Sequence, residues 1–134
     1  MKSSETLRER VRTRAQNRCE YCRLHQDYSE LSLHLEHIIA RQDVAGNDLE
    51  NLALACHCCN RKKGPNLAGI DSLTNEITPL FHPRRDNWQD HFRWNGPIID
   101  GLTPAGRATA NVLALNDGKR MKLRFQLLDR RALD

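Results

Sequence analysis

The chain has 134 residues, of which 39% are hydrophobic and 28% charged, and its mean hydropathy is −0.70. This length suits one domain, and the apolar runs are too short for a membrane span. The amino-terminal stretch carries charges where a secretory signal needs an apolar run, so we expect a cytoplasmic protein without a membrane partner. The net charge of +4 favours a polyanionic partner.

The first half of the chain predicts one helix followed by two strands. Apolar residues recur every four positions over residues 4–17, which predicts a helix that Ser3 or Ser4 can cap. Alternating apolar residues predict strands over residues 31–39 and 51–55, joined by a polar loop of about ten residues. The two strands would therefore form a hairpin.

The second half predicts short elements and two further helices. A short helix containing residues 60–63 should end at Gly64 and Pro65. Residues 90–102 suggest a hairpin around Asn95 and Gly96. Thr103 followed by Pro104 is typical of a capped helix start, and a last helix is expected over residues 119–129. We expect the aromatic rings of this half, at Phe81, Trp88, Phe92 and Trp94, to pack mostly in the core.

Five cysteines are present, an odd count that in a reducing compartment favours metal ligands or free thiols over disulfides. Four of them form two Cys-x-x-Cys pairs separated by 33 residues: Cys19 with Cys22, and Cys56 with Cys59. Such pairs supply the four thiolates of a tetrahedral zinc site. The spacing predicts a structural zinc with no open position for substrate, and the alternative is a set of four buried free thiols.

Two neighbours of the second pair fit this zinc site poorly. Pairing Cys58 with Cys56 would leave only one residue between ligands, so Cys58 is expected to be a small packed residue or an exposed thiol. His57 could replace a cysteine, but two complete pairs need no replacement, and we expect it to be exposed.

Between and after the cysteine pairs lie the stretches "LEHII" and "ENLALACHCCNRKKG". Glu-His on a strand, Asn-Leu at the next strand and Cys-x-x-Cys-Asn-x-x-Lys together resemble the HNH endonuclease family in its four-cysteine form. The resemblance covers about residues 18–64. It implies an α+β fold: a ββα-metal (His-Me finger) core stapled by a four-cysteine zinc knuckle, with an amino-terminal helix and a carboxy-terminal helical extension over residues 65–134. Residues 1–134 would then form a single domain.

The resemblance also implies roles for four side chains. His37 would be the general base, and Asn51 would orient it. Glu36 and Asn60 would bind a divalent cation at which the phosphodiester is hydrolysed. Two oxygen ligands suit Mg²⁺ or Mn²⁺ better than a second zinc. Strict alternation puts Glu36 and His37 on opposite strand faces, so both reach one site only if the strand ends or bends there.

Several basic residues are candidates for phosphate contacts: Arg61, Lys62 and Lys63 after the second cysteine pair, then Arg84 and Arg85, and Arg41 in the hairpin loop. Each can also be read as part of a solvated surface. His34, close to Glu36, is equally open to a supporting role or a plain surface position.

The sequence thus predicts a metal-dependent endonuclease that hydrolyses DNA, most simply double-stranded DNA. One active site cuts one strand, so a double-strand break would need a homodimer or two successive events. The alternatives are a zinc-containing module that binds nucleic acid without catalysis and a subunit of a larger nuclease complex.

Overall fold

The computed structural model describes residues 6–39 and 49–129. Two short 3-10 turns, η1 (Gln26–Tyr28) and η2 (Leu49–Asn51), accompany the helices and strands. In chain order these are α1 (Leu7–Arg14), β1 (His34–His37), β2 (Leu52–Ala55), α2 (His57–Lys63), β3 (Ala68–Ile70), β4 (Ile77–Pro79), α3 (Trp88–His91), β5 (Phe92–Asn95), β6 (Ile98–Gly101), α4 (Pro104–Val112) and α5 (Gly118–Asp129).

Helix α1 is shorter than predicted and begins at a different cap. Thr6 accepts a hydrogen bond from the Glu9 backbone at 3.0 Å, and the Glu9 side chain accepts one from the Thr6 backbone at 2.8 Å. This reciprocal pair satisfies two backbone donors at the helix start. The cap is thus Thr6, and Ser3 and Ser4 lie outside the described residues. Val11 faces the core and is fully buried.

Strands β1 and β2 pair antiparallel, with Glu36 opposite Ala53 and His37 opposite Leu52. Helix α2 follows directly and starts at His57, three residues earlier than the first residue expected in it. The reason is its cap: the Cys56 side chain accepts a hydrogen bond from the Cys59 backbone at 3.4 Å. The helix ends at Gly64, whose φ of 51° suits glycine. The predicted ββα core is confirmed.

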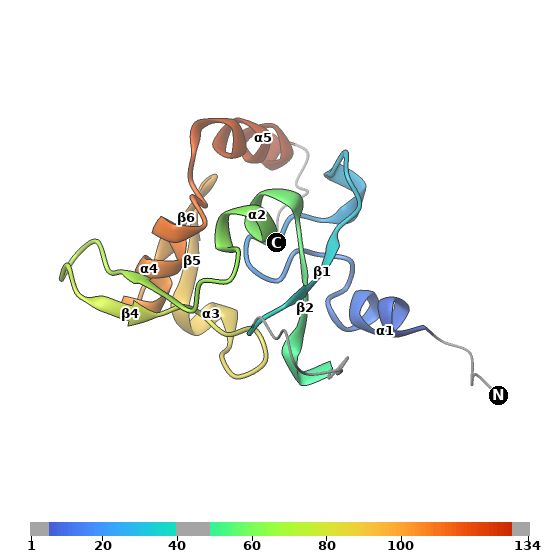
Figure 1. Cartoon of the computed structure of the whole chain (residues 1–134). Helices are drawn as coiled ribbons and strands as arrows, with labels where there is room; N and C mark the ends of the chain where they lie inside the picture. The colour runs from blue at the N-terminus through green and yellow to red at the C-terminus, as the bar shows by residue number, and fades with distance from the viewer. Residues whose placement is uncertain (1–5, 40–48, 130–134) are drawn as a thin grey trace.

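The second half builds two more hairpins and three helices, α3, α4 and α5, around this core (Figure 1). β5 and β6 form the predicted hairpin, with Asn95 opposite Ile98, so the turn is formed by Gly96 and Pro97. Gly96 has a φ of 59°. Thr103 caps α4 and Pro104 occupies its first turn, also as predicted. α4 packs against β3 and β6, and α5 lies beyond α2 on one side of the molecule.

One cluster of buried residues joins both halves of the chain, from Val11 and Leu33 to Leu113 and Leu115. The predicted core packing of the aromatic rings is confirmed. Phe81 and Phe92 are buried with ring centroids 5.3 Å apart, and Trp88 stacks on Phe92 at 5.1 Å. Phe125, by contrast, is 60% exposed. None of the described helices is both long and apolar enough to cross a membrane.

Asp71 and Arg107 tie the turn after β3 to α4. Arg107 donates hydrogen bonds of 2.7 and 3.0 Å to the two oxygens of the buried Asp71 carboxylate, and this holds the pKa of Asp71 below its usual range. A carboxylate with a lowered folded pKa stabilises the fold above its unfolded pKa of about 3.9 and loses that effect as the pH falls further.

Replacing Asp71 with asparagine should therefore lower the melting temperature at pH 7. The difference from wild type should shrink as the pH is lowered below about 4, because the unfolded carboxylate then takes up a proton while the native one, held by Arg107, stays ionised to lower pH. Thermal melts of both proteins between pH 3 and pH 7 measure this. A difference that stays constant over that range would contradict the assigned pair.

Candidate functional site

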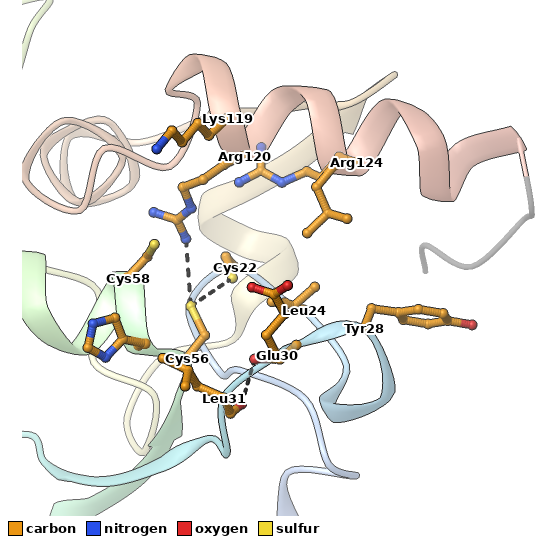
Figure 2. A pocket seen from close by; sticks show the side chains of 13 residues that line it. Cys22, Leu24, Tyr28, Glu30, Leu31, Cys56, Cys58, Lys119, Arg120 and Arg124 are labelled. Atoms are coloured by element: carbon orange, nitrogen blue, oxygen red, sulfur yellow. Dashed lines mark hydrogen bonds between the residues drawn. The ribbon is translucent and has the colours of Figure 1, made fainter.

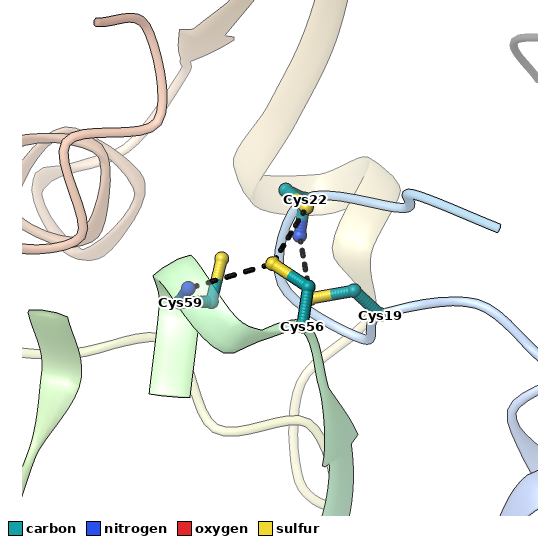
Figure 3. Close-up of side chains that lie close together, drawn as sticks. All are labelled: Cys19, Cys22, Cys56 and Cys59. Carbon is teal, nitrogen blue, oxygen red and sulfur yellow. Dashed lines mark hydrogen bonds between the residues drawn. The ribbon is translucent and has the colours of Figure 1, made fainter. Parts of the chain in front are cut away.

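The four predicted metal ligands meet at one point. Cys19 and Cys22 come from the loop after α1, and Cys56 and Cys59 from the start of α2 (Figure 3). All four are buried, and their sulfur atoms lie within 4.8 Å of one another. Sulfurs at about 2.3 Å around a tetrahedral zinc would be about 3.8 Å apart. The Cys22 and Cys56 sulfurs are 3.7 Å apart, so the cluster fits such a metal ion.

Backbone amides support the sulfur atoms in both turns. Cys22 N–H points to Cys19 Sγ and Cys59 N–H to Cys56 Sγ, each at 3.4 Å. Hydrogen bonding with Cys19 lowers the pKa of Cys22 and of Cys56, whereas burial raises the pKa of Cys19 and of Cys59. Within the described residues, two of the four sulfur atoms thus accept a backbone N–H, a contact that also suits a metal-bound thiolate. Cys58 stays outside it, half-buried, and His57 is exposed, both as predicted.

Glu36 lies in the interior between the first cysteine loop and α2. Its Oε2 accepts a hydrogen bond from the Tyr21 hydroxyl at 2.7 Å, and Lys63 Nζ lies 2.7 Å from its Oε1. The Lys63 contact is an ion pair by its distance. It does not meet the angular criteria of a hydrogen bond, and Oε1 accepts none from the other described residues. Burial raises the pKa of Glu36, and the Lys63 charge only partly offsets this effect.

Lys63 corrects one prediction. Its side chain is 2% exposed, pairs with Glu36 and donates a hydrogen bond to the Ile38 carbonyl at 2.8 Å. An ammonium group so enclosed presents no charge to a phosphate backbone. We therefore remove Lys63 from the expected nucleic-acid surface and assign it to the interior of the ββα core.

His37 and Asn51 sit at the end of the hairpin. His37 is exposed while its neighbour Glu36 is buried, so the strand alternation holds through both residues. The Asn51 side chain donates to the Ile39 carbonyl at 3.0 Å and accepts from the Ile39 amide at 2.9 Å. Asn51 thus fixes the backbone two residues after His37, where an interaction with the imidazole itself was expected.

Asn60 is half-buried on α2, and its side-chain amide makes no hydrogen bond to a described residue. Its Oδ1 can therefore bind a metal ion, or its Nδ2 can donate a hydrogen bond to a substrate oxygen. Glu36 is different, because an ion at its Oε1 would have to share that oxygen with Lys63. Of the two expected ligands of a catalytic cation, only Asn60 is free of such a competitor within the described residues.

Two histidines lie side by side between β1 and the start of α2. The rings of His34 on β1 and His57 on α2 have centroids 5.7 Å apart. His34 Nε2 is buried and has no hydrogen-bond partner among the described residues. Within the described part of the chain, His34 therefore gives Glu36 no hydrogen-bonded support.

The basic candidates separate into exposed and buried ones. Arg61, Lys62 and Arg85 are exposed. Arg84 is nearly buried and forms an ion pair with Glu20. The prediction that Arg84 contacts phosphate is therefore wrong, and its role is structural. Arg41 lies outside the described residues.

Sequence reasoning missed three residues that shape the site: Tyr21, Glu20 and Arg120. Glu20 and Tyr21 occupy the two positions inside the first Cys-x-x-Cys, and polar side chains there were a usable signal. The Glu20 carboxylate accepts a hydrogen bond from the Leu54 backbone amide at 2.8 Å, which links this loop to β2. Arg120 donates to Cys59 Sγ at 2.9 Å, a contact over 61 residues that no local pattern could indicate.

The combination of an antiparallel hairpin, a following short helix and a four-cysteine cluster defines a zinc-knuckle ββα protein. Residues 19–66 match the family model described as HNH endonuclease, so this segment is similar to the HNH family. A curated relative is the Septu protein PtuB of Bacillus thuringiensis, 27% identical over 108 residues. The match covers 78% of this chain but only 39% of PtuB, so the chain spans about two fifths of that protein's length. No solved structure matches.

Proposed function

We propose that this protein is an HNH endonuclease that hydrolyses phosphodiester bonds of DNA inside the cell. The observation that carries the proposal is the family match over the segment that forms the β1–β2 hairpin, α2 and the four-cysteine cluster. Zinc is the metal we propose for the cluster, since four thiolates at this spacing suit it. Its role is structural, because four protein ligands leave no position for substrate.

His37 is the proposed general base. Its side chain is exposed at the end of β1, where it can reach both a water molecule and a phosphate. Imidazole is the side chain best suited to accept a proton near neutral pH. Asn51 holds the backbone at Ile39 through two hydrogen bonds, which restricts movement of the strand end that carries His37. Asn51 therefore positions the base through the main chain.

Asn60 and Glu36 are the proposed ligands of a catalytic Mg²⁺ or Mn²⁺. Such an ion, when bound, would stabilise negative charge on the scissile phosphate. Asn60 fits this role in the observed conformation, whereas Glu36 fits it only if Lys63 yields Oε1. Asn60 and the exposed Arg61 and Lys62 lie on the same helix, which packs against β1, so α2 offers contacts for a phosphate.

The proposal also includes further contacts with DNA, the kind of DNA substrate and the assembly of the protein. Arg85 offers an exposed charge for the DNA backbone, and Arg41 is a proposed contact from the hairpin loop. Double-stranded DNA is the proposed substrate, and a homodimer would let two active sites cut both strands. Conversion of supercoiled plasmid to the nicked form before the linear form would indicate a single site acting on one strand at a time.

Plasmid cleavage with Mg²⁺ or Mn²⁺ tests the function. His37→Ala should lower the cleavage rate at least about 100-fold, because proton transfer by a positioned base contributes about 10²- to 10⁴-fold. His57→Ala is the matched control: it also removes an exposed histidine of the same core and should cleave at the wild-type rate. Equal cleavage by wild type and His37→Ala would refute His37 as the base.

The second candidate function is DNA binding without cleavage, alone or as a subunit of a larger nuclease. The ion pair of Glu36 with Lys63 favours it, because a carboxylate already neutralised has less need of a divalent cation. Salt-dependent DNA binding by the wild-type protein, with no cleavage in Mg²⁺ or Mn²⁺, would support this reading over the first.

A further inference from the structure

The four-cysteine cluster places a net negative charge in the interior. Four thiolates around a divalent ion carry two excess negative charges, and burying uncompensated charge is costly. Three arginines lie near enough to interact electrostatically with the cysteines: Arg23, Arg120 and Arg124. Two of them belong to α5, a helix far from the cluster in sequence.

Arg120 makes the closest of these contacts. Its Nη2 lies 2.9 Å from Cys59 Sγ. It also lies 3.9 Å from Cys56 Sγ, and this second contact is drawn in Figure 2. Its Nη1 donates to the carbonyls of Leu113 and Ala114, at 2.7 and 3.2 Å. Burial alone would lower the pKa of Arg120, but the neighbouring thiolates outweigh it and raise that pKa. One guanidinium therefore bridges the cluster and the chain that leads into α5.

Arg124, one turn later, is buried as well but holds α5 in a different way. It donates to the Pro97 and Leu115 carbonyls and to Asn116 Oδ1, and it donates no hydrogen bond to a sulfur among the described residues. The two arginines thus separate two roles. Arg124 attaches α5 to the hairpin side of the molecule, and Arg120 attaches it to the thiolates.

Helix α5 also forms one wall of a cavity of about 580 Å³. Cys22 and Cys56 line this cavity from one side, and Lys119, Arg120 and Leu123 line it from the other. The cavity is thus an approach to two of the four metal ligands, and α5 limits its width. A chelator or a competing metal ion could reach these two ligands by this route.

We propose that Arg120 is a positioning residue of the metal centre. Through its contact with Cys59, Arg120 couples the docking of α5 to the retention of the metal ion. The metal fixes the sulfur positions that Arg120 binds, and Arg120 in turn stabilises the thiolates by a charge-assisted hydrogen bond. Such coupling is reciprocal, so the loaded cluster also strengthens the docking of α5. This inference concerns the structural metal and does not depend on whether the protein cleaves DNA.

The test measures zinc release from the full-length chain to an excess of a chromophoric chelator. Arg120→Gln should speed release about 10- to 100-fold, the range typical for losing a partner of a metal ligand. Arg124→Gln is the matched control, because it loosens α5 without removing a bond to sulfur. It should change the rate several-fold less than Arg120→Gln. Arg120→Lys keeps the charge but loses the fork of donors, and it should fall between wild type and Arg120→Gln.

A spectroscopic readout separates the direct contact from a general loosening of α5. In the cobalt-substituted protein, the thiolate-to-metal charge-transfer band should move to longer wavelength in Arg120→Gln and stay unchanged in Arg124→Gln. Hydrogen exchange of α5 should rise in the wild-type protein when the metal is removed. Equal release rates in Arg120→Gln and Arg124→Gln with unshifted bands would overturn the proposal, and so would a purified chain that holds no metal.

Discussion

Replacing Cys22 with serine should abolish metal binding and unfold the ββα core. Cys22 is buried and its sulfur lies 3.7 Å from that of Cys56, so serine removes one corner of the cluster. Binding of a structural zinc contributes apparent free energies of about 10–16 kcal/mol, which equals or exceeds the whole stability of a typical domain. Metal analysis of the purified protein and thermal melting by circular dichroism measure the two effects.

Cys58→Ser is the matched control for this experiment. Cys58 lies on α2 next to the ligand Cys59, but it is outside the four-cysteine cluster and only half-buried. It should keep one equivalent of zinc and the wild-type melting profile. A Cys22→Ser protein with full zinc content and native melting would show that the ligand assignment is wrong, and loss of zinc in Cys58→Ser would place the fifth cysteine in the site.

The second large effect is expected at the buried ion pair of Glu36 and Lys63. Lys63→Met leaves the Glu36 carboxylate buried without its cation, which typically costs about 3–5 kcal/mol. The stability measured by urea unfolding should fall accordingly. Lys62→Met, at the neighbouring exposed position, should change the free energy of unfolding by no more than about 0.5 kcal/mol.

The double variant Glu36→Gln with Lys63→Met tests the physical origin of that loss. It removes both charges, so it should be more stable than Lys63→Met alone even though it carries one more substitution. A double variant less stable than both single ones would mean that packing, and not charge, dominates here. Adding Mg²⁺ to Lys63→Met should raise its melting temperature more than that of wild type if Glu36 Oε1 is a cation ligand.

Local patterns sufficed for the parts of the fold that local chemistry determines. A Cys-x-x-Cys turn brings two sulfurs together through its own backbone, so the metal cluster could be predicted from spacing. The cap at Thr103 and the turn at Gly96 are likewise set by one or two neighbouring residues. The ββα arrangement followed from the resemblance of residues 18–64 to a known family.

The orientation of side chains on α2 could not be predicted in the same way. Lys63 was expected, together with Arg61 and Lys62, to contact phosphate or solvent, because the three cations follow one another directly after the second cysteine pair. The cap at Cys56 fixes where α2 begins and thus which side chains face the core. Lys63 points inward, toward Glu36 and Ile38. Arg84 and Arg120 also depend on partners more than 60 residues away, Glu20 and Cys59, and a single sequence offers no sign of such pairings.

The loop between Cys19 and Cys22 shows how closely the two halves of the chain depend on each other. Glu20 binds Arg84, the Tyr21 carbonyl accepts a hydrogen bond from Trp88 at 2.8 Å, and the Tyr21 hydroxyl binds Glu36. A fragment cut to residues 19–66 would leave the buried Glu20 carboxylate without its cation. The segment that can be recognised by similarity is therefore smaller than the unit that can fold, and we expect excision or grafting of it to fail unless its carboxy-terminal partners travel with it.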